Sequence, residues 1–156
     1  MILEVENGCF GYPKQEEILK NINLHLEKGH ILSVLGPNGI GKTTLLKCMI
    51  GLLPWTSGRS ILNGTDLCKM KSKDIWNTIS YIPQAHSFSF SYTGLEMVML
   101  GRSSHLGLFE QPGAQEIEMA EVMMEKVGIT RLAGKDCNRM SGGELQMVLI
   151  ARALIN

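Results

Sequence analysis

Residues 36–43 read Gly-Pro-Asn-Gly-Ile-Gly-Lys-Thr and fit the pattern G-x-x-x-x-G-K-[ST]. Glycines at these positions let successive backbone N–H groups turn inward around a polyphosphate, because no Cβ stands in the way. In this pattern Lys42 reaches the β- and γ-phosphates, and the hydroxyl of Thr43 is a ligand for Mg²⁺. A glycine-rich turn before an ordinary helix would need neither the lysine nor the hydroxyl. The motif therefore indicates binding of a nucleoside triphosphate.

The spacing of the glycines separates this loop from the other common nucleotide-binding loop. Gly36, Gly39 and Gly41 follow the order G-x-x-G-x-G, whereas dinucleotide-binding loops follow G-x-G-x-x-G. The surrounding sequence also suits a phosphate loop, since a short apolar run precedes it and a helical pattern follows it. We therefore expect a triphosphate rather than NAD at this loop.

A second glycine motif, Ser141-Gly142-Gly143-Glu144, precedes the last helical pattern. In one interpretation it is a capping box, with Ser141 at the N-cap and Glu144 three residues later. A cap needs no glycine pair, however, and two glycines at a helix start leave backbone N–H groups open to a phosphate. The residues alone are compatible with both interpretations.

These motifs require a strand, a loop and a helix in the first half of the chain, and another helix in the second half. Residues 31–35 are a short and nearly all-apolar run, which suits a strand buried on both faces. Residues 42–50 then read as a helix that Gly51 and Pro54 end. The remaining patterns predict strands at 2–10, 18–26, 59–63 and 79–83, helices at 115–127 and 142–154, and the start of a helix within 94–101.

Length and composition limit the class of protein. A chain of 156 residues with 44% apolar and 19% charged residues reads as globular, with one domain or one domain and a small insert. The net charge is zero, which argues against a nucleic-acid binder that works by bulk charge. The apolar runs are too short to span a bilayer, and the N-terminus has no signal-peptide pattern. The four cysteines are scattered, so no disulfide or metal framework is expected.

The two glycine motifs, in this order and roughly a hundred residues apart, resemble those of the ATP-binding subunits of ABC transporters. The phosphate loop matches the Walker A loop. Residues 140–144 match the signature motif, with Met140 for the usual leucine and Glu144 for the commoner glutamine. Gln84 stands at the position of the Q-loop glutamine, and Tyr12 at that of an aromatic residue that stacks on adenine. The resemblance covers the whole chain.

The resemblance implies an α/β fold of the P-loop NTPase class, with an N-terminal antiparallel β portion and an inserted helical subdomain. It divides the chain into a β-rich and P-loop core at 1–84 and a helical subdomain at 85–156, and it leaves the core sheet incomplete at the C-terminus. It assigns catalytic roles to Lys42 and Gln84, and Mg²⁺ binding to Thr43 and Gln84. The nucleotide-binding residues that it implies are Tyr12, Gly36, Pro37, Asn38, Gly39, Ile40, Gly41, Lys42, Thr43, Thr44, Ser141, Gly142, Gly143 and Glu144.

The resemblance also implies a function that uses ATP and Mg²⁺. ATP binding and hydrolysis would drive the import of a metal chelate, haem or a cobalamin-like solute, since residues 90–102 and 145–154 are similar to importers of that type. The expected partners are a membrane permease and a second ATP-binding subunit, with no nucleic acid. The chain would be peripheral on the cytoplasmic face of the cell membrane. In such a pair Gly36–Thr43 of one subunit faces Ser141–Glu144 of the other.

Several catalytic groups of the family have no counterpart in the 156 residues. After the signature helix the family continues with an apolar strand ending in Asp-Glu and, further on, a switch histidine. Here no run of four or more apolar residues precedes an acidic pair. We therefore expect very slow ATP hydrolysis, or none, by this polypeptide alone. We also expect unpaired strand edges and exposed apolar faces, which favour aggregation or pairing with another chain.

Two other functions fit parts of the pattern. A shortened module could bind nucleotide, or dock on a partner ATPase, without hydrolysis. Nucleotide-dependent pairing without phosphate release would distinguish that module. Another P-loop enzyme, such as a GTPase or a small-molecule kinase, fits less well, because the chain has no N-K-x-D motif and Ser141–Glu144 would be unexplained.

Overall fold

The computed structural model describes residues 2–83, 91–103 and 113–155. The chain divides into two compact units, Met1–Ile75 and Trp76–Asn156, and each is described by itself. The predicted boundary between residues 84 and 85 lies outside the described residues.

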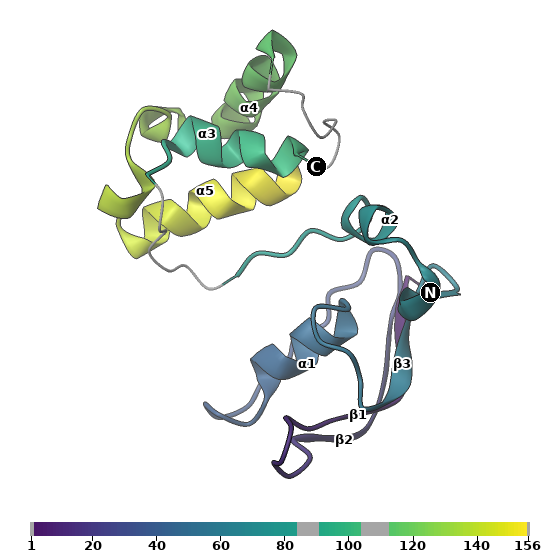
Figure 1. The fold of residues 1–156 in the computed structure, drawn as a ribbon. Helices are drawn as coiled ribbons and strands as arrows, with labels where there is room; N and C mark the ends of the chain where they lie inside the picture. Colours follow the sequence, from purple (N-terminus) through teal and green to yellow (C-terminus); the bar gives the residue numbers. More distant parts are fainter. Residues whose placement is uncertain (1, 84–90, 104–112, 156) are drawn as a thin grey trace. The chain divides into compact units, whose positions relative to one another are not determined.

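The first unit is built on an antiparallel sheet, as its alternating apolar residues predict. Its described part holds a four-stranded sheet in the order β2-β1-β3-β4, and every neighbouring pair is antiparallel (Figure 1). The predicted strands at 2–10, 18–26 and 59–63 are confirmed. The strands are β1 (Leu3–Phe10), β2 (Leu19–Leu26), β3 (Ser57–Leu62) and β4 (Thr65–Asp66).

Helix α1 (Lys42–Met49) packs against this sheet (Figure 1). Its last turn carries the buried Cys48, which joins Phe10 of β1 and Leu19 of β2 in one apolar cluster. The helix ends before Gly51, which has the left-handed φ of 78° that a helix stop of this kind requires. The predicted helix at 42–50 is thus confirmed to within a residue.

The apolar run at residues 31–35 differs from its prediction. It is neither strand nor helix, and Ile31 and Leu35 are 94% and 90% exposed. A strand buried on both faces needs neighbours at both edges and layers above and below it. In the described part of the chain, no strand pairs with this run. Residues 79–83 also lack strand structure, so the predicted strands at 31–35 and 79–83 are both wrong. The expected exposure of apolar residues is confirmed by Ile31 and Leu35.

The second unit is helical. Helices α3 (Gly94–Met99), α4 (Ala114–Val127) and α5 (Gly142–Leu154) pack on one another (Figure 1). Each of the three corresponds to a predicted helix. The short α2 (Ser72–Trp76) lies where the two units join in sequence. The 3₁₀ turns of the second unit are η2 (Leu100–Arg102), η3 (Thr130–Leu132) and η4 (Cys137–Arg139), and η1 (Leu67–Lys69) belongs to the first unit.

The core of the second unit lies between its three long helices. Val98 of α3, Met124 of α4 and Val148 of α5 are each fully buried and belong to one cluster. Thr93 caps α3 through a capping box with Glu96, and Gly128 ends α4 with a φ of 76°. These local signals set where α3 begins and where α4 ends. Within the described residues, no helix is both long and apolar enough to cross a bilayer.

Candidate functional site

The phosphate loop of the first unit needs glycine at two positions for different reasons. Gly39 and Gly41 both have left-handed backbones, with φ values of 83° and 103°. Around Gly39 there is open space, so only its backbone requires glycine. At Gly41 a Cβ would also stand 2.7 Å from Cγ2 of Ile18, a distance that side chains do not adopt. Gly41 is the N-cap of α1, and a substitution there would move the start of the helix.

Lys42 folds back across this loop. Its Nζ donates hydrogen bonds to the carbonyl oxygens of Gly36 and Pro37, each at 2.7 Å. The backbone N–H groups of residues 38–41 donate no hydrogen bond to a backbone carbonyl within residues 2–83, 91–103 and 113–155. The loop therefore offers an ammonium group and open N–H donors together at the positive end of α1, which is the donor set that a polyphosphate requires.

The remaining loop residues are accessible. Asn38, Ile40 and Thr43 are exposed, and Ile40 retains 58% of its accessible surface. Thr44 is half-buried on the first turn of α1. The hydroxyl of Thr43 can therefore meet a hydrated cation at the edge of the loop, as the sequence pattern predicts.

Tyr12 lies in the segment between β1 and β2, which also holds Ile18. Its ring meets that of Phe10 edge to face, with centroids 5.0 Å apart, and the residue is 39% exposed. The backbone N–H of Ile18 donates to the Phe10 carbonyl at 2.8 Å, and the Ile18 side chain contacts the Gly41 position. Ile18 of this segment thus lies beside the start of α1, while the stacking of Tyr12 on a base stays a prediction.

The second glycine motif begins α5 in the second unit. The Ser141 Oγ accepts a hydrogen bond from the Glu144 N–H at 3.3 Å. In return, Oε2 of Glu144 accepts from the Ser141 N–H at 2.9 Å and from the Ser141 Oγ–H at 3.1 Å. The predicted capping box is therefore confirmed. Gly142 and Gly143 are exposed, and a Cβ on either would meet nothing within 4 Å. Packing does not require these glycines, which leaves the phosphate interpretation open beside the cap.

Two basic side chains that the sequence analysis missed hold Glu144. The Lys135 Nζ donates to Oε2 at 2.8 Å, and a guanidinium nitrogen of Arg131 lies 3.5 Å from Oε1. The Lys135 hydrogen bond, with those from Ser141, lowers the pKa of Glu144 to about 2. Lys135 and Arg131 stand nine and thirteen residues before Glu144, so no local spacing rule connects them to it.

This pKa shift makes a prediction about stability. We expect Glu144→Gln to lower the free energy of unfolding modestly at pH 7, as is usual for an accessible ion pair. Because the folded pKa is depressed, the contribution is present above the ordinary value of 4.5 and is lost as the pH falls towards 2. Urea midpoints of the two proteins should therefore converge over that range. The exposed Glu125→Gln on α4 is the control, and a pH-independent difference for Glu144→Gln would contradict the prediction.

Gln84 lies outside the described residues, so its placement beside the phosphate loop stays a prediction. The two glycine motifs lie in different units. Each motif therefore has a local geometry defined within its own unit.

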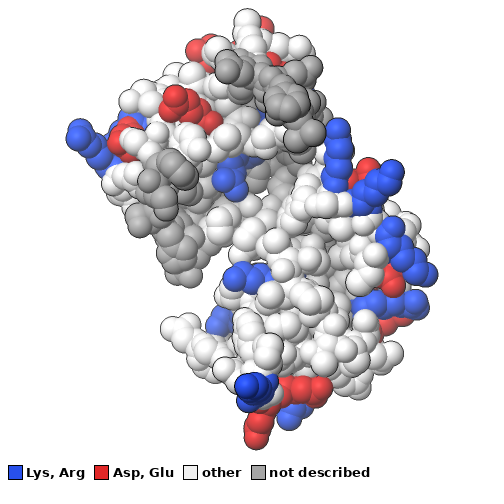
Figure 2. All heavy atoms as spheres, in the orientation of Figure 1, with Lys and Arg blue, Asp and Glu red and all other residues white. Residues whose placement is uncertain are grey.

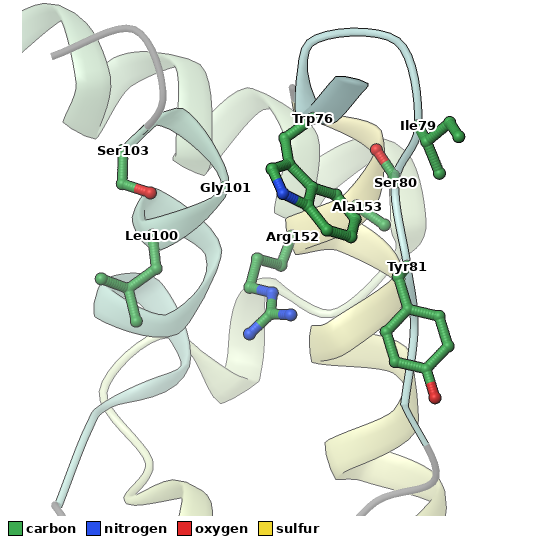
Figure 3. A pocket seen from close by; sticks show the side chains of 9 residues that line it. All are labelled: Trp76, Ile79, Ser80, Tyr81, Leu100, Gly101, Ser103, Arg152 and Ala153. Atoms are coloured by element: carbon green, nitrogen blue, oxygen red, sulfur yellow. The ribbon is translucent and has the colours of Figure 1, made fainter. Parts of the chain in front are cut away.

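Two surface features lie apart from the predicted site residues. A cavity of about 430 Å³ in the second unit is lined by residues that include Trp76, Tyr81 and Arg152 (Figure 3). Arg152 also donates to the sulfur of Met97 at 3.7 Å, and burial lowers its pKa. None of the predicted nucleotide-binding residues lines this cavity. On the face drawn in Figure 2, basic side chains lie in small groups, several of them beside acidic side chains.

The sequence and the fold match one family throughout. The family model described as ABC transporter matches residues 19–156. A protein of Helicobacter pylori described as "Probable iron chelatin transport ATP-binding protein" is 39% identical over 156 residues, which cover 99% of this chain and 61% of that protein. A manganese transport system ATP-binding protein of Bacillus subtilis is 36% identical over 154 residues, covering 97% of this chain and 59% of that protein. The chain thus spans about three fifths of the length of these relatives.

Solved structures agree with the sequence match. A putative metal-chelate type ABC transporter in an inward-facing conformation superposes with a TM-score of 0.81 at 34% identity, over 99% of this chain and 55% of that chain. A bacterial ABC transporter cassette solved as a dimer superposes with a TM-score of 0.84 at 26% identity, over 99% of this chain and 70% of that chain.

Proposed function

Because the chain belongs to the ABC transporter family, we propose that it forms the nucleotide-binding part of an ATP-binding subunit, with the phosphates of ATP held by residues 36–44. The observation that carries the proposal is the loop itself. Its ammonium group and its open N–H donors belong to one loop at the start of α1. The predicted fold class is confirmed, since the chain superposes on ABC ATPase cassettes of the P-loop class and combines an antiparallel sheet with helices.

In the proposed complex, Lys42 exchanges its two carbonyl acceptors for oxygens of the β- and γ-phosphates. The N–H groups of residues 38–44 bind the remaining phosphate oxygens, and the ring of Tyr12 stacks on adenine. The hydroxyl of Thr43 and the side chain of Gln84 would hold Mg²⁺, which neutralises charge on the phosphates when bound. The exposed Thr43 hydroxyl fits this role.

The second motif acts on a nucleotide held by another subunit. In this proposal Ser141 and the N–H groups of Gly142 and Gly143 meet the γ-phosphate bound by the loop of a second copy. The open backbone at both glycines supports this step. ATP then closes the pair because it makes contacts that only the closed state offers, which is a population shift. The segment around Gln84 would pass this closure to a membrane permease on the cytoplasmic face.

The proposed cargo is a metal ion or metal chelate. Its support is the similarity to a relative described for iron chelatin and another described for manganese. Haem and cobalamin-like solutes remain narrower versions of the same proposal. The slow hydrolysis expected of these 156 residues alone also stays a prediction, and a phosphate-release assay at the ordinary rate of the family would contradict it.

Titration with a fluorescent ATP analogue tests the proposal directly. We expect saturable, Mg²⁺-dependent binding that unlabelled ATP displaces. GTP should displace it about as well as ATP does, because stacking on the ring of Tyr12 does not distinguish the two purines. Binding that ATP does not displace would contradict the proposed function. A clear preference for GTP would favour another class of P-loop protein.

A further inference from the structure

We propose that Lys135 is a positioning residue for the Ser141 segment. By binding the Glu144 carboxylate, it holds that carboxylate against Ser141 and cancels its charge where a partner's phosphate would arrive. This inference rests on the proposed function, in which Ser141–Gly143 meets the nucleotide of a second copy. Lys135 itself touches no nucleotide in this account, and it acts only through Glu144.

The contacts of Glu144 divide between its two oxygens. Oε2 takes the Lys135 ammonium at 2.8 Å, and the same oxygen accepts from the Ser141 N–H and Oγ–H at 2.9 and 3.1 Å. Oε1 faces Arg131 at 3.5 Å, and that side chain is 74% exposed. The short bond to Lys135 therefore sets the position of the oxygen that meets Ser141, and the longer contact to Arg131 adds a screened charge.

Lys135 is presented by a segment that is itself fixed. Its backbone N–H donates to the Leu132 carbonyl at 3.1 Å, and its carbonyl accepts from the Gly94 N–H at 3.0 Å. The neighbouring Asp136 does not compete for the ammonium, because its carboxylate accepts from the Ser91 hydroxyl at 2.6 Å and from the Asn138 N–H at 2.8 Å. The ammonium is thus held at Glu144 by contacts with α3 and η3.

The charge of Glu144 matters because of its place in the helix. A carboxylate in the first turn competes with a phosphate for the positive end of α5 and repels it. Paired with Lys135, the same group leaves the surroundings of Gly142 and Gly143 close to neutral. Without Lys135, only the exposed Arg131, 3.5 Å from Oε1, would offset the negative charge beside the N–H groups that are proposed to bind the γ-phosphate. A glutamine at this position would carry no charge and would not need the lysine.

The experiment measures two properties of the same chain in four variants. ATP binding to the chain's own loop is followed with the fluorescent analogue, and ATP-dependent association of two chains by sedimentation. We expect Lys135→Met to raise the ATP concentration for half-maximal association by about tenfold, as the loss of one charge-assisted bond implies. Glu144→Gln sets its own baseline, and the double variant should associate as Glu144→Gln alone does, because no carboxylate then needs the lysine. Lys126→Met, on the exposed face of α4, is the matched control.

The rescue separates charge compensation from a merely structural role. A structural role of Lys135 predicts that the double variant associates as poorly as Lys135→Met, and that result would overturn the inference. Unchanged association of Lys135→Met would also overturn it, while the proposed function would stand. A wild-type chain that binds ATP without associating overturns the inference too, because Ser141 would then meet no partner phosphate. A wild-type chain that binds no ATP contradicts the proposed function itself.

Discussion

Replacing Lys42 by methionine should weaken the binding of ATP by about a hundredfold. The Nζ of Lys42 donates two hydrogen bonds of 2.7 Å, to the carbonyls of Gly36 and Pro37, and in the proposed complex it donates to phosphate oxygens instead. A hydrogen bond to a charged group contributes roughly 1.5–3 kcal/mol, and about 1.4 kcal/mol is a factor of ten in affinity. Because the phosphate oxygens are charged and the carbonyls are not, we expect the exchange to gain roughly 1.5 kcal/mol per bond, so losing both gains costs a factor of about a hundred.

The matched control for this variant is Lys47→Met in the last turn of the same helix. It removes the same charge from α1 but lies away from the phosphate loop, so we expect its ATP affinity to change by less than about twofold. Equilibrium titration with the fluorescent analogue gives both affinities. Thermal unfolding should show that both variants fold. Equal losses of ATP affinity in the two variants would mean that Lys42 acts only through the net charge of the chain. That result would contradict its assignment to the phosphates.

The parts of the fold that the sequence predicts correctly depend on local chemistry. Both glycine motifs lie at helix starts, and Ser141 and Glu144 form the capping box that their spacing predicts. Gly128 ends α4 with a positive φ, as a glycine after an amphipathic run usually does. Strands 2–10 and 18–26 pair because they are near in sequence and share one apolar face. Each of these signals lies within a few residues of the feature that it sets.

The parts that the sequence does not predict depend on distant segments. The run at 31–35 has the composition of a buried strand, yet a strand exists only when other strands pair with it, and none of those described does. The contact of Lys135 with Glu144 depends on a turn between them that folds the chain back. No spacing rule for helices or strands predicts such a turn, so the sequence does not place Lys135 or Arg131 in the site.

Replacing Gly94 by alanine should unfold much of the helical unit. An added Cβ at Gly94, the first residue of α3, would collide with the carbonyl oxygen of Leu132. The obstacle is backbone and cannot rotate away. The site is held further by hydrogen bonds of 3.0 Å from the Gly94 N–H to the Lys135 carbonyl and from the Leu95 N–H to the Ala133 carbonyl. Forcing a methyl group into such a contact costs about 3 kcal/mol or more of the free energy of unfolding.

Gly134→Ala, in the same segment, provides the comparison. A Cβ at Gly134 meets nothing within 4 Å, so we expect the free energy of unfolding to change by less than about 0.5 kcal/mol. Urea unfolding followed by circular dichroism gives both values. The phosphate loop lies in the other unit, so Gly94→Ala should retain ATP binding while it loses ATP-dependent association. A Gly94→Ala protein as stable as Gly134→Ala would show that α3 and the Leu132 segment can move apart, and that the placement of Lys135 against Glu144 is looser than its 2.8 Å bond implies.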